Sequence, residues 1–172
     1  EHDGKFPDTY ESIIKLKGVG PYTASAIASF AFNLPYAVTD GNVLRILARF
    51  FGISIPINTT EGKNYFAGLA QILITPSFPA LYNQGIMDFG ATICKPKLPL
   101  CNQCPLQSEC TAYKKNTIAL LPVKTNKPVK KHRYLFYVIA EYKNKIYVRK
   151  RTEKDIWQNL WEFISVEMPE RT

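Results

Sequence analysis

The chain has 172 residues, which is enough for one domain or two small ones and for a buried core. Its 22 Lys and Arg residues outnumber its 14 Asp and Glu residues, and the net charge of +8 indicates a polyanionic partner, either nucleic acid or an anionic membrane surface. No apolar run reaches the length of a membrane span, and the first residues lack the basic start and apolar stretch of a signal peptide. We therefore expect an intracellular protein with reduced cysteines.

Helical patterns dominate the first two thirds of the chain. Helices are expected over 10–16, 23–33, 41–52, 61–74 and 81–94. The third of these segments has apolar residues along one face and a glycine, Gly52, that ends it. That apolar face comprises Val43, Ile46, Leu47 and Phe50. The last segment runs into a cysteine-rich loop.

The composition changes after Cys110. Between Cys110 and Glu141 there are seven Lys or Arg residues and no acidic residue, with prolines at positions 122 and 128. This pattern predicts a basic, extended interdomain linker over 121–132. Beyond it, aromatic and branched residues alternate around "KNK" (143–145), which predicts a β-hairpin.

All four cysteines lie close together, with the spacing C-x6-C-x2-C-x5-C: Cys94, Cys101, Cys104 and Cys110. Four thiolates in so short a loop can enclose one compact metal cluster, and soft sulfur ligands suit a 4Fe-4S cluster. Structural zinc is the alternative, although zinc ribbons more often have two separate C-x2-C pairs. Disulfide bonds are the third option, and a reducing compartment disfavours them.

The stretch "LKGVGPYTA" (16–24) lies between two expected helices. Gly18 and Gly20 permit positive φ angles and leave the neighbouring backbone N–H groups uncovered. Together with the N-terminus of the following helix, those donors make an anion site suited to a DNA phosphate. A tight helix–helix turn without any ligand fits the same pattern.

Asp40 directly precedes an expected helix in "VTDGNVLR". Its plainest role is that of an N-cap, whose carboxylate accepts from N–H groups of the first turn. A capping carboxylate is also held ionised and oriented, which is useful opposite a developing cation. Because Asp40 follows Gly20 by twenty residues, the intervening helix can return it beside the phosphate site.

Together and in this order, these features resemble the helix-hairpin-helix DNA glycosylase superfamily. The resemblance rests on "LKGVGPYTA", on the Asp of "VTDGNVLRILARFFG", and on "NQGIMDFGATIC" running into the four-cysteine loop. In that superfamily this cysteine spacing holds a 4Fe-4S cluster. Tyr22 stands where the lyase branch carries a Schiff-base Lys, and Lys17 lies on the other side of the glycines, so the resemblance implies a monofunctional glycosylase.

Tyr22, "NQGIMDFGA" and the C-terminal extension are similar to the MutY type, the A/G-specific adenine DNA glycosylases. Within the extension, "KDIWQNLWEFISVE" resembles the start of that family's Nudix-like domain, which reads 8-oxoguanine; Trp157 and Trp161 there are expected mainly to pack. No Nudix catalytic box is present, so no nucleotide hydrolysis is expected. The segments with the family's general-acid Glu and the rest of its Nudix-like domain find no match, so we expect a fragment that does not excise adenine.

The resemblance implies a mainly α architecture: a partial helix-hairpin-helix glycosylase fold with an iron–sulfur cluster loop, followed by the opening β-hairpin of a Nudix-like α/β domain. It divides the chain into the end of a six-helix barrel with the hairpin (1–36), a cluster domain (37–120), the basic linker (121–132) and a truncated Nudix-like start (133–172). The implied partner is double-stranded DNA with an A:8-oxoguanine or A:G mispair, with other repair proteins as further partners and no membrane. The implied location is a bacterial cytoplasm or nucleoid.

The resemblance also implies roles for single residues. Asp40 would stabilise the oxocarbenium-like sugar, with Tyr22 and Asn42 lining the base pocket. The residues implied to hold DNA are Gly18, Val19, Gly20, Lys95 and Lys97, and those implied to hold the cluster are Cys94, Cys101, Cys104 and Cys110. Arg45 could link the Asp40 helix to the cluster thiolates or form an ordinary salt bridge, and the two lysines could simply be solvated.

Two other functions fit the pattern. One is another iron–sulfur glycosylase, of the thymine-mismatch or endonuclease III type, because Tyr22 also occurs in mismatch-specific relatives. The other is a non-catalytic iron–sulfur module that binds DNA and senses redox state, because N-capping alone explains Asp40.

Overall fold

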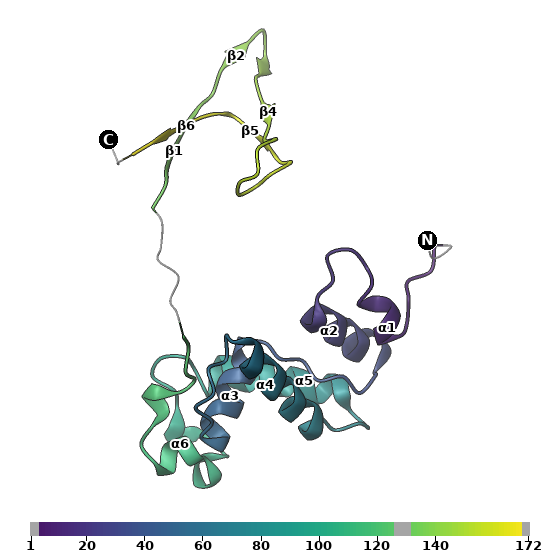
Figure 1. Cartoon of the computed structure of the whole chain (residues 1–172), viewed down its shortest axis with the longest axis vertical. Coiled ribbons are helices and arrows are strands. Elements are labelled where there is room, and N and C mark those ends of the chain that lie inside the picture. The colour runs from purple at the N-terminus through teal and green to yellow at the C-terminus, as the bar shows by residue number, and fades with distance from the viewer. Residues whose placement is uncertain (1–3, 126–131, 170–172) are drawn as a thin grey trace. The chain divides into compact units, whose positions relative to one another are not determined.

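Figure 1 shows the computed structural model of the chain, which describes residues 4–125 and 132–169. The chain divides into two compact units, 1–127 and 128–172. The first unit is helical and the second consists of short β-strands. Part of the expected linker, 126–131, lies outside the described residues.

The first unit follows the expected order of helices. These are α1 (Tyr10–Ile13), α2 (Pro21–Phe32), α3 (Gly41–Phe51), α4 (Thr60–Leu73), α5 (Pro79–Thr92) and α6 (Thr111–Lys114). Short 3-10 turns lie at η1 (Cys101–Gln103), η2 (Gln107–Glu109) and η3 (Ile118–Leu120). Helix α1 is shorter than predicted, and α2 and α5 each begin two residues earlier than predicted, at Pro21 and Pro79. Proline suits a first helical position because its fixed φ is already helical and its missing N–H is not needed there.

Local sequence explains where the helices begin and end. Asp40 caps α3, and Thr59 caps α4 by accepting from the Gly62 N–H at 3.0 Å. Gly52 ends α3 in the left-handed conformation, with φ 67°, as the sequence predicts. Asn33 ends α2 in the same conformation, with φ 52°. Asparagine tolerates this region better than most residues because its short side chain can bond locally.

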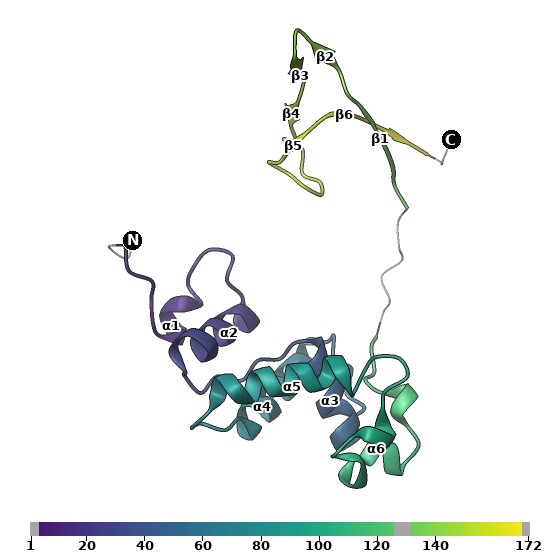
Figure 2. The ribbon, with the colours of Figure 1, turned by 180° about the vertical axis from the view of Figure 1, so that it is seen from behind.

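Two apolar clusters hold the helical unit together. The larger one joins α3, α4 and the segment before α3, and it contains Phe66, which is fully buried. Burying one such side chain contributes about 1.5–3 kcal/mol. The smaller one lies between α1 and α2 and consists of Ile13, Ala24 and Ala28. Helix α5 lies against α3, as Figure 2 shows from behind.

The second unit contains three two-stranded antiparallel pairings. Strand β1 (Tyr134–Val138) pairs with β6 (Ile164–Met168), β2 (Glu141–Tyr142) with β3 (Lys145–Ile146), and β4 (Arg149–Lys150) with β5 (Trp161–Glu162). The predicted hairpin is β2–β3. Its two turn residues, Lys143 and Asn144, have φ angles of 49° and 57°, the signature of a type I′ turn.

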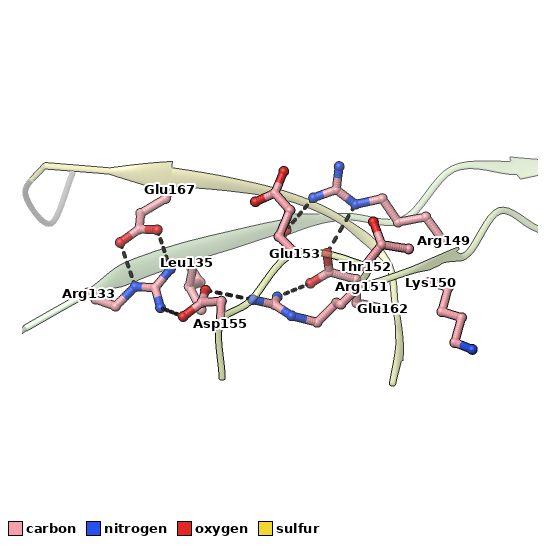
Figure 3. Close-up of a pocket in the computed structure, with 11 residues that line it drawn as sticks. Arg133, Leu135, Arg149, Lys150, Arg151, Thr152, Glu153, Asp155, Glu162 and Glu167 are labelled. Carbon is pink, nitrogen blue, oxygen red and sulfur yellow. Dashed lines mark hydrogen bonds and ion pairs between the residues drawn. The ribbon is translucent and has the colours of Figure 1, made fainter. Parts of the chain in front are cut away.

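Ion pairs cross this unit and line a polar pocket (Figure 3). Arg133 donates to Asp155 at 2.8 Å and to Glu167, and Arg151 also donates to Asp155, at 3.0 Å. Arg149 and Arg151 both donate to Glu162. Each of these three arginines faces a carboxylate. The pocket is therefore lined by a network of ion pairs that connects the strands of this unit.

The two tryptophans of the second unit are not core residues in the described structure. Trp157 is 54% exposed and Trp161 is 68% exposed, so the expectation that both mainly pack is wrong for this unit. Trp157 has a left-handed backbone, with φ 60°, and its ring lies 5.8 Å from the Arg151 guanidinium. At this distance the Arg151 guanidinium makes a cation–π contact with the indole.

No helix in the described ranges is both long enough and apolar enough to cross a membrane.

Candidate functional site

Asp40 occupies the N-cap of α3, and both of its carboxylate oxygens accept hydrogen bonds. Oδ1 accepts from the backbone N–H groups of Asn42 at 2.9 Å and Val43 at 2.8 Å. Oδ2 accepts from the Asn42 side-chain amide at 2.9 Å. These three donors fix the direction of the carboxylate, and Asp40 remains partly exposed. The predicted cap is therefore confirmed, and it holds an anionic group that solvent or a ligand can still reach.

A chain of hydrogen bonds runs from Asp40 to the cysteine loop. Asn42 donates to Asp40, and its own side-chain oxygen accepts from Arg45 at 2.8 Å. Arg45 also donates to the carbonyl oxygens of Gly90 and Cys94, each at 2.7 Å. Burial lowers the pKa of Arg45 below its usual value, and the nearby Cys94 partly opposes that shift. Arg45 thus links the Asp40 helix to the cysteine loop, through a backbone carbonyl rather than a thiolate, and it forms no salt bridge within the described ranges.

Gly90 allows α5 to approach the beginning of α3 closely. A Cβ atom at this position would lie 2.6 Å from the Asn42 Cβ and 3.2 Å from both the Asn42 Cα and the Ile46 Cδ1. Any larger side chain would therefore displace Asn42, which contacts Asp40 directly. Sequence reasoning did not single out Gly90, and its helical position in "DFGA" gave no local signal.

The glycine turn between α1 and α2 is open on its outer side. Gly18 has a φ of 86°, which favours glycine, whereas Gly20 is extended, with φ −96°, and does not use the positive φ it permits. A Cβ atom on either residue would meet no atom within 4 Å. No backbone carbonyl in residues 4–125 accepts from the N–H groups of Gly18 or Gly20. The turn therefore offers two N–H donors next to the N-terminus of α2.

The four cysteines line one cavity. Cys94, Cys101, Cys104 and Cys110 all border it, together with Arg49. Burial raises the pKa of the Cys101 and Cys104 thiols, and the neighbouring cysteines raise both further. Among the described residues, which include all four cysteines, no three His, Cys, Asp or Glu side chains are arranged to hold a single metal ion. The donor set itself, four thiols around one cavity, fits a sulfur-ligated cluster.

Arg49, which sequence reasoning missed, is buried beside this cavity. It is 4% exposed and lies one turn after Arg45 on α3. Its guanidinium donates to the carbonyl oxygens of Lys95 at 2.8 Å and Pro96 at 3.2 Å, and it lies 3.5 Å from the Cys94 Sγ. The Cys110 thiol in turn donates to the Arg49 carbonyl at 3.5 Å. Arg49 therefore contacts both the first and the last cysteine of the loop.

The remaining predicted site residues are at least partly exposed. Tyr22 is 45% exposed in the first turn of α2, and no hydrogen bond joins it to Asp40 within the described part of the chain. Lys97 is exposed in the cysteine loop, and Lys95 is half-buried. The structure thus brings Asn42 to Asp40 directly and leaves Tyr22 and the lysines free to meet a ligand.

Comparisons with known proteins agree with this arrangement. A model of the helix-hairpin-helix motif matches residues 1–30. A solved structure of a thermostable thymine-DNA glycosylase matches with a TM-score of 0.62 and 34% identity, over 67% of this chain and 52% of that one. A non-covalent endonuclease III–DNA complex matches with a TM-score of 0.55 and 25% identity over the same shares. The helical unit therefore has the fold of the helix-hairpin-helix DNA glycosylases.

Relatives in sequence show to which type of DNA glycosylase the chain is related. The adenine DNA glycosylase of Buchnera aphidicola subsp. Schizaphis graminum is 37% identical over 163 residues, which cover 95% of this chain and 47% of that protein. The adenine DNA glycosylase of Arabidopsis thaliana is 38% identical over 94% of this chain and 28% of its own length. The human adenine DNA glycosylase is 46% identical over 65% of this chain and 21% of its own length. The chain is a homologue of the adenine DNA glycosylases, the MutY type. It spans about half the length, or less, of these relatives.

Proposed function

We propose that the protein is a monofunctional glycosylase of base-excision repair that removes adenine mispaired with 8-oxoguanine or guanine. The observation that carries the proposal is the Asp40 carboxylate, held by three donors at a helix N-terminus in a homologue of adenine DNA glycosylases. Hydrolysis of an N-glycosidic bond builds positive charge on the sugar, and a fixed anion stabilises that charge without reorganising. The partly exposed carboxylate of Asp40 is suited to this task.

The other residues of the proposed site bind and position DNA. The target adenine has to leave the stack before its glycosidic bond can be reached. Tyr22 and Asn42 line the pocket in this proposal, and Asn42 also orients Asp40. Protonation of the base needs a general acid, and the family's Glu for this role has no match within these 172 residues.

The hairpin and the cysteine loop supply the backbone contacts in this proposal. The N–H groups of Gly18 and Gly20 would bind a DNA phosphate, because helix N-termini and uncovered amides attract anions. The N–H group of Val19, between them, already donates to the Leu16 carbonyl at 3.1 Å, so Val19 would shape the turn rather than donate to the phosphate. Lys95 and Lys97 would approach the DNA backbone from the cysteine loop.

A 4Fe-4S cluster, when bound by Cys94, Cys101, Cys104 and Cys110, would tie the ends of this loop together through iron–thiolate bonds. The role of the chain itself is to shape the loop: Arg49 holds the carbonyl groups of Lys95 and Pro96, and Arg45 holds that of Cys94. Loss of the thiolates would release the two lysines from their places, which is why the cluster is proposed as architecture rather than as a reactant.

A substrate panel tests the proposal. The complete gene product is incubated under single-turnover conditions with duplexes that contain A:8-oxoguanine, A:G, T:G or an undamaged pair. We expect adenine release from the first two duplexes only, without strand cleavage until alkali is added. Strand cleavage without alkali would indicate a lyase, and release of thymine alone would replace adenine with thymine as the substrate.

Thymine-mismatch repair is the second candidate. It is favoured by the 34% identity to the solved thymine-DNA glycosylase and by Tyr22 at the position where lyases carry Lys. The T:G duplex in the panel separates the two candidates directly.

A further inference from the structure

The connection between α2 and α3 contains an extended segment, 35–38, that belongs to no β-sheet in the described structure. Its polar backbone groups nevertheless have partners. The buried side chain of Asn83, on α5, donates from Nδ2 to the Tyr36 carbonyl at 2.9 Å. Its Oδ1 accepts from the Val38 N–H at 3.1 Å. One amide group therefore binds two backbone groups on the same edge of the segment.

A second amide does the same on the opposite edge. Gln71, on α4, donates from Nε2 to the Pro35 carbonyl at 2.7 Å, and its Oε1 accepts from the Ala37 N–H at 3.0 Å. Each amide thus takes the carbonyl of one residue and the N–H of the residue two positions later. A residue of a parallel neighbouring strand takes the same pair of groups. The segment is held on both edges like the central strand of a sheet, with Asn83 and Gln71 in place of the neighbouring strands.

The two amides differ in their environment. Asn83 is 1% exposed, so its amide cannot turn to water instead. Gln71 is exposed, so water can replace its bonds in part. Asn83 is consequently the stronger constraint on the segment, and Gln71 reinforces it from the surface.

The position of this segment connects it to Asp40. Val38, whose N–H bonds to Asn83, lies two residues before Asp40, and the segment begins just after α2, the helix that follows the glycine turn. Gly90 is seven residues after Asn83 on α5, which is two helical turns, so both lie on one face of the helix. The Gly90 carbonyl accepts from Arg45, which holds Asn42 against Asp40. Helix α5 therefore holds the chain on both sides of Asp40.

We propose that Asn83, supported by Gln71, is a positioning residue that sets where Asp40 stands relative to the glycine turn. Asn83 holds the backbone that precedes Asp40, and the hydrogen bonds that join Gly90, Arg45 and Asn42 hold the backbone that follows Asp40. The inference rests on the proposed catalytic role of Asp40, and it assigns to Asn83 no contact with DNA or with the reacting atoms.

The test uses N83D in the complete gene product. When ionised, the new carboxyl group can accept from the Val38 N–H but cannot donate to the Tyr36 carbonyl; when protonated, it can do both. We expect the single-turnover rate of adenine release per folded molecule to fall about 10-fold or more at pH 8, and to approach the wild-type rate as the pH is lowered. Affinity for the uncleaved duplex should change less than threefold. The matched control is Q84A, one position along α5, because within residues 4–125 and 132–169 the Gln84 amide bonds only inside its own helix, to Asp88.

Q71A is the second variant, in case N83D folds poorly. Because Gln71 is exposed, its removal should leave the fold intact and reduce the rate several-fold, again with little change in affinity. If N83D and Q71A, once corrected for the folded fraction, both release adenine at the wild-type rate at every pH, the inference is wrong. A rate loss in N83D that merely follows the folded fraction, with Q71A unchanged, would also overturn it.

Hydrogen exchange separates this inference from the proposed function. The N–H groups of Asn42 and Val43 are protected by the Asp40 carboxylate, and their exchange reports on its position without any substrate. We expect faster exchange at these two groups in N83D and not in Q84A. If the wild-type protein releases no adenine but exchange is faster in N83D, the proposed glycosylase function is wrong and the positioning role of Asn83 stands. If the wild-type protein releases adenine but exchange at Asn42 and Val43 is the same in N83D, only the positioning role is wrong.

Discussion

Replacement of Gly90 by Ala tests whether close packing of α5 on α3 sets the position of Asp40. The added Cβ would lie 2.6 Å from the Asn42 Cβ, about 1 Å short of an ordinary carbon–carbon contact. The nearest obstacles are the backbone-linked atoms of Asn42, so α3 has to move by about that distance. Overpacking of this kind costs about 1–3 kcal/mol, and the better helix propensity of Ala returns about 0.8–1 kcal/mol.

The functional effect of G90A should exceed its effect on stability. A misplacement of about 1 Å at a reacting group can cost on the order of 100-fold in rate. We expect single-turnover adenine release by the complete gene product to fall about 10- to 100-fold, with the melting temperature lowered by only a few degrees. The control is G85A on the same helix, where an added Cβ meets no atom within 4 Å. That variant should keep its rate and gain up to about 1 kcal/mol. Equal rates for G90A and G85A would show that close packing of α5 on α3 does not set the position of Asp40.

Three further predictions concern the cluster, the DNA contacts and acid stability. Anaerobically purified protein should contain about four iron atoms per chain, and C101S should lose them, whereas one zinc per chain would contradict the cluster. DNA affinity should fall steeply with salt, and K97A should reduce the slope of log K against log salt by about 0.9, while a flat wild-type response would argue against phosphate contacts. The hydrogen bond from Arg133 lowers the pKa of Asp155 to about 2. The pKa of Asp155 in the folded protein therefore lies below the ordinary value near 4. The ionised Asp155 carboxylate thus stabilises the folded state above about pH 4, and this stabilisation is lost as the pH falls toward 2. Melting temperatures between pH 5 and pH 2 should therefore fall more in the wild type than in D155N, and equal falls would contradict the prediction.

The two ends of α3 could be predicted because their causes are local. Asp40 precedes an amphipathic segment and Gly52 follows it, and both act on the nearest turn of the backbone. The β2–β3 hairpin was predictable for the same reason, since its turn is made by two adjacent residues. The pairing of β1 with β6 was not, because it joins residues about thirty positions apart with no turn between them to mark it.

The partners of the polar core could not be predicted from local patterns. An amphipathic helix is expected to turn its arginines to water, and the link expected for Arg45 was to thiolates or a carboxylate. Arg45 and Arg49 are instead buried because carbonyl groups from α5 and the cysteine loop accept their hydrogen bonds. Asn83 binds backbone groups 45 and 47 positions earlier in the chain. No spacing rule connects such residues, and only the packed structure shows which backbone groups they bind.

The role of Asp40 is most directly tested by D40N in the complete gene product. Asn retains the shape of the side chain and can still cap α3, so the fold should persist while the negative charge is lost. If Asp40 stabilises the charge on the sugar, single-turnover adenine release from an A:8-oxoguanine duplex falls about 100-fold or more, with DNA affinity unchanged within a few-fold. D88N, which changes an exposed aspartate on α5, should release adenine at the wild-type rate. Adenine release by D40N at the wild-type rate would show that the Asp40 carboxylate does not stabilise the reacting sugar.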